Sequence, residues 1–224
     1  MTPESVKALV CDCDGVIVDS EVVAERALVS ALSQYAPPEQ VAGVIRELFG
    51  QSTTEILGLI ERRFGIALPD QFEEALYSEI EELIATTAEP IAGVRTALEA
   101  IDLPLVVVSN STHASVSNSV RRAGLERRIA GRIFTAEMVG VPKPAPQVYL
   151  RAVAELQTPA ACCLAIEDSA AGVQSAVAAG VPVLGFVGAS HIPPGHADRL
   201  LSLGAIDVLD RMSDLPALVQ RLMQ

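Results

Sequence analysis

Two aspartates one residue apart stand where an apolar run ends, in ALVCDCDGVIVDSE, residues 8–21. Carboxylates can act as nucleophiles, transfer protons or hold cations. Successive side chains of a strand point to opposite faces, so a regular strand cannot aim both Asp12 and Asp14 at one target. The spacing therefore predicts that the chain leaves strand geometry near Cys13, and that Gly15 permits the bend that follows. Ordinary turn chemistry is the alternative interpretation of the same residues.

Three further stretches place polar residues at predicted strand ends or in the loops beside them. They are Ser109 and Asn110, then Lys143 in VPKPAPQVY, then Glu167 and Asp168 in AIEDSAAGVQSAVAAG. Each has an ordinary structural explanation, such as a helix cap, a surface charge or an interaction with a helix dipole. Together with the first pair, however, they make four carboxylates at one edge of a sheet. Such carboxylates repel one another unless a cation neutralises them, and their hard oxygens suit Mg²⁺.

The elements that position these residues are short β-rich runs alternating with helix-length segments. The runs cover residues 8–11, 104–109, 132–135, 162–166, 181–186 and, more weakly, 205–209; the helix-length segments include 112–123, 146–156 and 169–179. This alternation predicts an α/β fold with a doubly wound, Rossmann-like parallel sheet. Ligands of such sheets bind beyond the carboxyl ends of the strands, which is where the polar residues are expected.

The alternation is interrupted by a long helical interval. Between about residues 20 and 87, apolar residues recur at helical spacing with charged residues between them. We therefore predict an inserted all-helical cap domain at residues 19–88, within an α/β core domain formed by residues 1–18 and 89–224. The insertion follows the first strand, so we expect it to cover the carboxyl end of that strand like a lid.

Composition excludes several classes of function. A net charge of −12 gives no support for binding nucleic acid or an anionic membrane surface. The four cysteines, Cys11, Cys13, Cys162 and Cys163, lack a zinc-ligand spacing and are expected to be free core residues in a reducing compartment. Neither a signal peptide nor an apolar segment of about 18 residues is present, which predicts a cytoplasmic protein. No feature of the sequence indicates an oligomeric state.

The four motifs, in this order, resemble the haloacid dehalogenase superfamily of phosphotransferases. The match consists of DCDGVIVDSE, a strand ending in Ser109–Asn110, Lys143–Pro144, and Glu167–Asp168–Ser169 with the helix that follows. It spans essentially the whole chain. It is greatest for the branch with an inserted helical cap, which contains β-phosphoglucomutases, phosphoglycolate phosphatases and other sugar-phosphate phosphatases. The resemblance therefore implies a phosphatase acting on a small phosphorylated metabolite, either a sugar phosphate or a phosphorylated sugar acid.

The resemblance implies a catalytic role for each motif residue. Asp12 would be the nucleophile that forms an aspartyl-phosphate, and Asp14 would protonate the leaving oxygen and later activate water. Ser109 and Lys143 would hold the phosphoryl oxygens, and Lys143 would also offset the negative charge between Asp12 and the substrate. Asn110 would add a hydrogen bond to the phosphate, although a structural role at the helix start is an equally good interpretation.

The resemblance also implies a Mg²⁺ site. The ion would take oxygens from Asp12, from the backbone carbonyl of Asp14 and from Asp168, with Glu167 as a ligand or as a partner of the ligands. In the cap, Gln51, Ser52 and Thr53 of FGQSTTE could form a substrate-binding turn, and an interhelical loop is the alternative. The histidines His113, His191 and His196 are interpreted as structural residues of a helix start and of a Pro- and Gly-rich loop. The alternatives are that His113 approaches the substrate and that the loop borders the site.

Four alternatives to a phosphatase remain. A β-phosphoglucomutase would carry a histidine and an arginine at the positions that fall on Ala24 and near Thr53, which weighs against a mutase. Dehalogenases of the superfamily lack the second aspartate of the first motif. A receiver-like phospho-switch combines similar residues but does not require a helical lid. A nicotinamide-binding protein is disfavoured because no GxGxxG follows the first strand.

Overall fold

The computed structural model describes residues 5–47 and 53–223, and the chain divides into two compact units. One unit consists of residues 1–19 and 88–224, and the other of residues 20–87. Within the first unit, the two chain segments that flank the second unit in the sequence lie side by side, since the Asp19 amide donates to the Glu89 carbonyl at 2.9 Å and Val18 pairs with Pro90.

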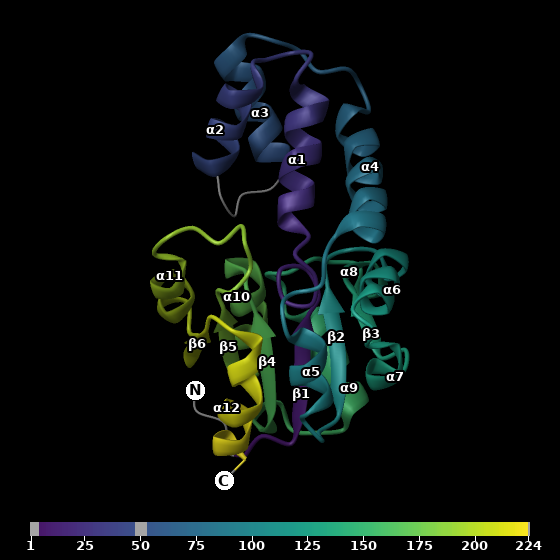
Figure 1. Ribbon diagram of the computed structural model, residues 1–224, viewed down its shortest axis with the longest axis vertical. Coiled ribbons are helices and arrows are strands. Elements are labelled where there is room, and N and C mark those ends of the chain that lie inside the picture. Colours follow the sequence, from purple (N-terminus) through teal and green to yellow (C-terminus); the bar gives the residue numbers. More distant parts are fainter. Residues whose placement is uncertain (1–4, 48–52, 224) are drawn as a thin grey trace. The chain divides into compact units, whose positions relative to one another are not determined.

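The first unit is built on a parallel sheet of six strands in the order β3-β2-β1-β4-β5-β6 (Figure 1). The strands are β1 (Ala8–Asp12), β2 (Leu105–Ser109), β3 (Ile133–Thr135), β4 (Cys163–Glu167), β5 (Val183–Phe186) and β6 (Asp207–Leu209). The predicted α/β fold with a Rossmann-like parallel sheet is therefore confirmed. The direction of strand succession reverses between β1 and β4, and this switch point is where sheets of this order bind their ligands.

Helices cover both faces of the sheet, which explains why its strands are continuous apolar runs. The helices of this unit are α5 (Val94–Glu99), α6 (His113–Arg122), α7 (Glu126–Ile129), α8 (Ala136–Val139), α9 (Gln147–Leu156), α10 (Ala170–Ala178), α11 (His196–Ser202) and α12 (Leu215–Leu222), with the 3₁₀ turns η1 (Ala160–Cys162) and η2 (Met212–Asp214). Figure 1 places α5 and α12 in front of the sheet, whereas α9 and α10 lie behind it.

All four cysteines are free and buried, as predicted.

Strand alternation assigns the terminal carboxylates to one face. Ala8 and Val10 of β1 pack in the same apolar cluster as Cys163 and Ala165 of β4, together with residues of α9 and α10. Side chains two residues apart share a face, so Asp12 and Glu167 continue these two rows at the carboxyl ends of β1 and β4. The pairing of Cys11 with Ile166 brings the two strand ends side by side.

The helices in the described part of the second unit are α1 (Glu21–Leu32), α2 (Pro38–Glu47), α3 (Thr53–Phe64) and α4 (Phe72–Thr87). Their buried residues recur at helical spacing, for example Ile56, Leu57 and Ile60 on α3, and Leu76, Ile80 and Ile84 on α4. Edge-on packing of Tyr35 against Phe72 adds an aromatic contact. None of the helices in the described residues of either unit combines the length and hydrophobicity that crossing a bilayer requires.

Candidate active site

The chain turns sharply after Asp12, the last residue of β1. The Cys13 carbonyl accepts a hydrogen bond from the Ile17 amide at 2.8 Å, and the Gly15 amide donates to the Val18 carbonyl at 2.8 Å. Gly15 has a φ of 77°, a backbone conformation that side-chain-bearing residues rarely adopt. The predicted departure from strand geometry, and the use of Gly15 for the bend, are therefore confirmed.

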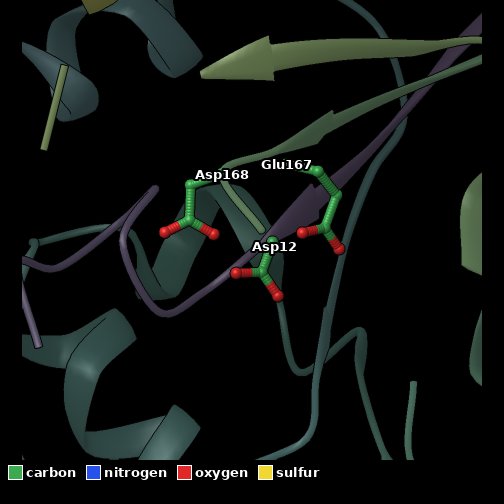
Figure 2. Close-up of side chains that lie close together, drawn as sticks. All are labelled: Asp12, Glu167 and Asp168. Carbon is green, nitrogen blue, oxygen red and sulfur yellow. The ribbon is translucent and has the colours of Figure 1, made fainter. Parts of the chain in front are cut away.

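Asp12, Glu167 and Asp168 form a buried acidic cluster at the switch point of the sheet. One carboxylate oxygen from each residue lies within 4.8 Å of the others, and all three side chains are buried. Figure 2 shows the three carboxyl groups gathered where β1 and β4 end. Hard carboxylate oxygens brought this close together are suitable ligands for a small divalent cation. The residues present therefore suit the Mg²⁺ that the motifs led us to expect.

Lys143 supplies a cation inside this cluster. Its ammonium Nζ lies 2.5 Å from Asp12 Oδ1 and 2.7 Å from Glu167 Oε1, and 3.4 Å from the Val108 carbonyl oxygen. Burial alone would lower the pKa of Lys143, but the attraction of Asp12 and then of Glu167 outweighs it and holds the pKa above its ordinary value. The side chain is therefore a permanent positive charge beside Asp12.

Asp12 is held in an environment that disfavours its charge. Burial raises the pKa of its carboxyl well above the ordinary value, and repulsion by Glu167 adds to this effect, whereas Lys143 opposes it. An additional cation next to Asp12 would lower this pKa and favour the ionised form. The electrostatics of the cluster are therefore consistent with the cation site that its geometry provides.

Asn110 is engaged with the backbone of Lys143. Its Oδ1 accepts from the Lys143 amide at 2.8 Å, and its Nδ2 donates to the Lys143 carbonyl at 3.3 Å. This two-point contact fixes the loop that carries the lysine. It favours the structural interpretation of Asn110, and the phosphate contact stays a prediction.

Asp14 lies within the turn that follows Asp12, and two serines orient its side chain. Ser109 Oγ and Ser111 Oγ donate to Asp14 Oδ2 at 2.9 and 2.8 Å, and Ser109 Oγ also accepts from the Ser111 amide at 2.9 Å. Ser109 is fully buried at the end of β2. The structure thus brings Ser109 to Asp14, and its contact with a phosphoryl group also stays a prediction.

The loop and helix after β5 contact Asp168 on two sides. His191 Nε2 lies 3.4 Å from Asp168 Oδ2, and its Nδ1 lies 3.7 Å from Asp19 Oδ1. His196, the first residue of α11, donates from Nε2 to the Asp168 backbone carbonyl at 2.6 Å. The loop that carries His191 therefore borders the acidic cluster. His113 instead begins α6, as expected, with its Nδ1 3.4 Å from the Ser117 hydroxyl of the same helix.

Of the three residues predicted to form a substrate-binding turn in the cap, the structure describes one. Gln51 and Ser52 lie outside the described residues. Thr53 is the first residue of α3 and is half-buried within the helical unit. Their role in substrate binding stays a prediction.

Sequence reasoning missed Ser111, Tyr149 and Gly172. Tyr149 donates its hydroxyl to Glu167 Oε1 at 2.6 Å, and a Cβ at Gly172 would lie only 1.9 Å from Glu167 Oε2. Tyr149 sits in an apolar helical pattern that indicates only a core position. Ser111 carried a usable signal, since it follows Ser109 and Asn110 in a run of polar residues after β2.

Besides its positive φ, Gly15 has a second feature that disfavours a side chain at this position. A Cβ at this position would lie 1.8 Å from Asp168 Oδ2. We expect Gly15→Ala to lower the melting temperature and to weaken divalent-cation binding by at least about tenfold, because Asp168 must move. Calorimetric titration with Mg²⁺ measures the second effect.

Gly140→Ala is the matched control for that experiment. Gly140 also has a φ of 77°, but apart from Gly140 and its two chain neighbours no atom lies within 4 Å of the position its Cβ would take. The Gly140→Ala variant should therefore lose only about 1–2 kcal/mol of folding stability, because alanine disfavours a positive φ, and its cation affinity should be unchanged. Equal cation affinity in the two variants would contradict the close approach of Gly15 to Asp168.

The parallel sheet, with a buried acidic cluster at its switch point, has the architecture of α/β proteins that bind ligands at the carboxyl edge of the sheet. A model of the haloacid dehalogenase-like hydrolase family matches residues 6–180, and the chain belongs to this family. The family predicted from the motifs is thereby confirmed.

Individual relatives agree with this assignment. The 6-phosphogluconate phosphatase of Escherichia coli (strain K12) is 28% identical over 190 residues, which cover 84% of this chain and 86% of the relative. A haloacid dehalogenase-like protein of unknown function from Agrobacterium tumefaciens str. C58 superimposes with a TM-score of 0.89 and 31% identity, covering 98% of this chain and 100% of that one. A HAD family hydrolase from Deinococcus radiodurans R1, solved with bound phosphate and sodium, gives a TM-score of 0.78 and 26% identity, covering 97% and 96%.

Proposed function

We propose that this hydrolase is a Mg²⁺-dependent phosphatase that acts on a small phosphorylated metabolite, either a sugar phosphate or a phosphorylated sugar acid, through an aspartyl-phosphate. The observation that carries the proposal is the buried Asp12 carboxylate, 2.5 Å from the Lys143 ammonium and grouped with Glu167 and Asp168. The similarity to a 6-phosphogluconate phosphatase, and to a hydrolase solved with phosphate, supports the same substrate class.

In the first half of the reaction, a carboxylate oxygen of Asp12 attacks phosphorus while the bond from phosphorus to the leaving oxygen breaks. Asp14 gives its proton to that oxygen, so the alcohol departs neutral. The Ser109 and Ser111 hydroxyls both donate to Asp14 Oδ2, which leaves Oδ1 for the proton transfer. Lys143 offsets the charge that builds up on the phosphoryl oxygens.

In the second half, Asp14 takes a proton from a water molecule, which attacks phosphorus and releases inorganic phosphate. The Asp12 carboxylate is thereby regenerated. Mg²⁺, held by Asp12, Asp168 and the Asp14 carbonyl with Glu167 nearby, would supply positive charge that offsets the carboxylates and orients the phosphoryl group. Asn110 would keep the Lys143 loop in place throughout, because it bonds to both the amide and the carbonyl of that residue.

A panel of phosphorylated sugars and sugar acids, including 6-phosphogluconate and β-glucose 1-phosphate, tests the proposal. We expect Mg²⁺-dependent release of inorganic phosphate, measured colorimetrically, from at least one member. Phosphorus NMR of the β-glucose 1-phosphate reaction distinguishes hydrolysis from isomerisation. Conversion to glucose 6-phosphate with little free phosphate would replace the phosphatase by a mutase, and a stable phosphoprotein without turnover would indicate a phospho-switch.

The start of α3 is expected to select the substrate rather than to perform chemistry. Thr53→Ala should change the ratio of kcat/KM between two good substrates by at least about fivefold, because a lost polar contact discriminates between hydroxyl patterns. The Mg²⁺ concentration for half-maximal activity should not change. The neighbouring Thr54→Ala is the control, since the Thr54 hydroxyl bonds to Glu73 within the helical unit. Equal substrate ratios for Thr53→Ala and the unmodified enzyme would refute this role.

A further inference from the structure

Tyr149 carries a hydroxyl that core packing does not require. The residue lies in the first turn of α9, is fully buried, and belongs to the apolar cluster behind β1, β2 and β4. A phenylalanine ring would fill the same space. Burying a hydroxyl costs free energy unless it is hydrogen-bonded, so the partner of this hydroxyl explains its presence.

That partner is the innermost carboxylate of the acidic cluster. Tyr149 Oη donates to Glu167 Oε1 at 2.6 Å, and the same oxygen accepts from Lys143 Nζ at 2.7 Å. On the other side, Ser169 Oγ donates to Glu167 Oε2 at 3.3 Å, and the backbone of Gly172 approaches so closely that a Cβ there would overlap the carboxylate. The Glu167 carboxylate is thus held between α9 and α10 in one orientation.

The Lys143 ammonium group donates hydrogen bonds to both Glu167 and Asp12. An ammonium group has three N–H bonds, and Nζ of Lys143 faces three oxygens, those of Asp12, Glu167 and the Val108 carbonyl. The Tyr149 ring lies 5.6 Å from Nζ, within the range of a cation–π contact. Tyr149 therefore contacts both partners of the Lys143–Glu167 ion pair.

The hydroxyl is a donor under all ordinary conditions. Burial raises the pKa of Tyr149 well above its usual value, and repulsion by Glu167 and then Asp12 raises it further. A protonated hydroxyl satisfies part of the hydrogen-bonding demand of Glu167. Without it, Glu167 would retain only Lys143 and Ser169 among these donors and would attract the ammonium group more strongly.

We propose that Tyr149 is a positioning residue for phosphoryl binding: by bonding to Glu167, it keeps Lys143 beside Asp12 and able to contact a phosphoryl oxygen. This inference rests on the proposed phosphatase function and adds a residue to it. In this proposal Tyr149 is neither a metal ligand nor a substrate-binding residue. It acts through Glu167 Oε1, the oxygen that it shares with Lys143.

Tyr149→Phe tests the inference because it removes the hydroxyl and keeps the ring. In calorimetric titration at saturating Mg²⁺, the variant should bind inorganic phosphate about tenfold more weakly than the unmodified protein, a loss typical of removing a partner of a ligand-binding side chain. Titration with Mg²⁺ alone should give a Kd within about twofold of the unmodified value, since the hydroxyl bonds to the oxygen facing Lys143.

Two variants separate positioning from general stability. Val148→Ala, at the adjacent fully buried position of α9, should lower the melting temperature without weakening phosphate binding. Tyr77→Phe, which removes an exposed hydroxyl, should change neither property. An equal loss of phosphate affinity in Val148→Ala and Tyr149→Phe would show that the effect is only structural.

The remaining outcomes also decide the question. Unchanged phosphate affinity in Tyr149→Phe would overturn the positioning role while leaving the phosphatase proposal intact. A parallel loss of Mg²⁺ and phosphate affinity would overturn it as well, because the effect would then not pass through Lys143. If the unmodified protein binds no phosphate in the presence of Mg²⁺, the proposed function fails and this inference fails with it.

Discussion

Asp12→Asn is expected to lower kcat for phosphomonoester hydrolysis by at least about a thousandfold, because an amide cannot serve as the nucleophile that forms the aspartyl-phosphate. The substitution keeps the shape of the side chain at the end of β1. Initial rates with the best substrate of the panel measure the effect. Mass spectrometry should detect a phosphorylated form in the unmodified enzyme and none in the variant.

The same variant should be no less stable than the unmodified protein when metal is absent. Burial raises the pKa of Asp12 in the folded state, so the folded protein binds a proton more tightly than the unfolded chain does. Ionised Asp12 therefore costs stability as pH rises from about 4 toward the folded-state pKa. The melting temperature of Asp12→Asn relative to the unmodified protein should thus increase with pH across this interval.

Asp102→Asn controls for the chemistry of the substitution, since Asp102 is an exposed carboxylate outside the acidic cluster. It should retain full turnover. If Asp12→Asn kept more than a few per cent of the unmodified rate, Asp12 would not be the nucleophile. Loss of turnover together with a collapsed melting temperature would show that Asp12 is needed for folding instead.

Removing divalent cations is expected to abolish turnover, and Mg²⁺ should restore it. Ca²⁺ should be a poor substitute, because it prefers more ligands at longer distances than the near-octahedral ~2.0–2.1 Å that Mg²⁺ requires. Activity after exhaustive chelation, followed by titration with each cation, measures this requirement. Full activity in the chelated enzyme would refute the metal assignment.

Asp168→Ala should raise the Mg²⁺ Kd by at least about tenfold. The His196 contact is to the backbone carbonyl of Asp168, so it survives the substitution and the local fold is supported. Ser109→Ala is the comparison, because Ser109 bonds to Asp14 rather than to the three clustered carboxylates. It should change Mg²⁺ affinity much less, and an equal effect of both variants would contradict the proposed ligand set.

The local sequence pattern is sufficient to predict the strands of the sheet and most of the polar residues at its carboxyl edge. A buried parallel strand must be a short apolar run, and the polar residue that ends such a run must lie at the carboxyl edge of the sheet. Asp12, Ser109 and Glu167 were placed in this way, each within one residue of the observed strand end. The strand boundaries shifted by only one or two residues because the last paired residue depends on the neighbouring strand.

The partners of these residues were decided by the tertiary structure. The contacts from Lys143 to Asp12, from Asn110 to the Lys143 backbone and from Tyr149 to Glu167 join positions 131, 33 and 18 residues apart. Periodicity shows that a residue such as Tyr149 is buried, but not which atoms its hydroxyl meets.

By itself, then, the sequence determined the fold class, the family and the edge at which the polar residues gather, because these follow from local patterning and from motifs in a set order. Only the tertiary structure decided how the charges are shared: Lys143 between Asp12 and Glu167, Asp14 held by two serines, and Asp168 bordered by His191 and His196. The physical reason is that hydrogen-bond geometry varies over tenths of an ångström and is set by packing between segments that are distant in the chain.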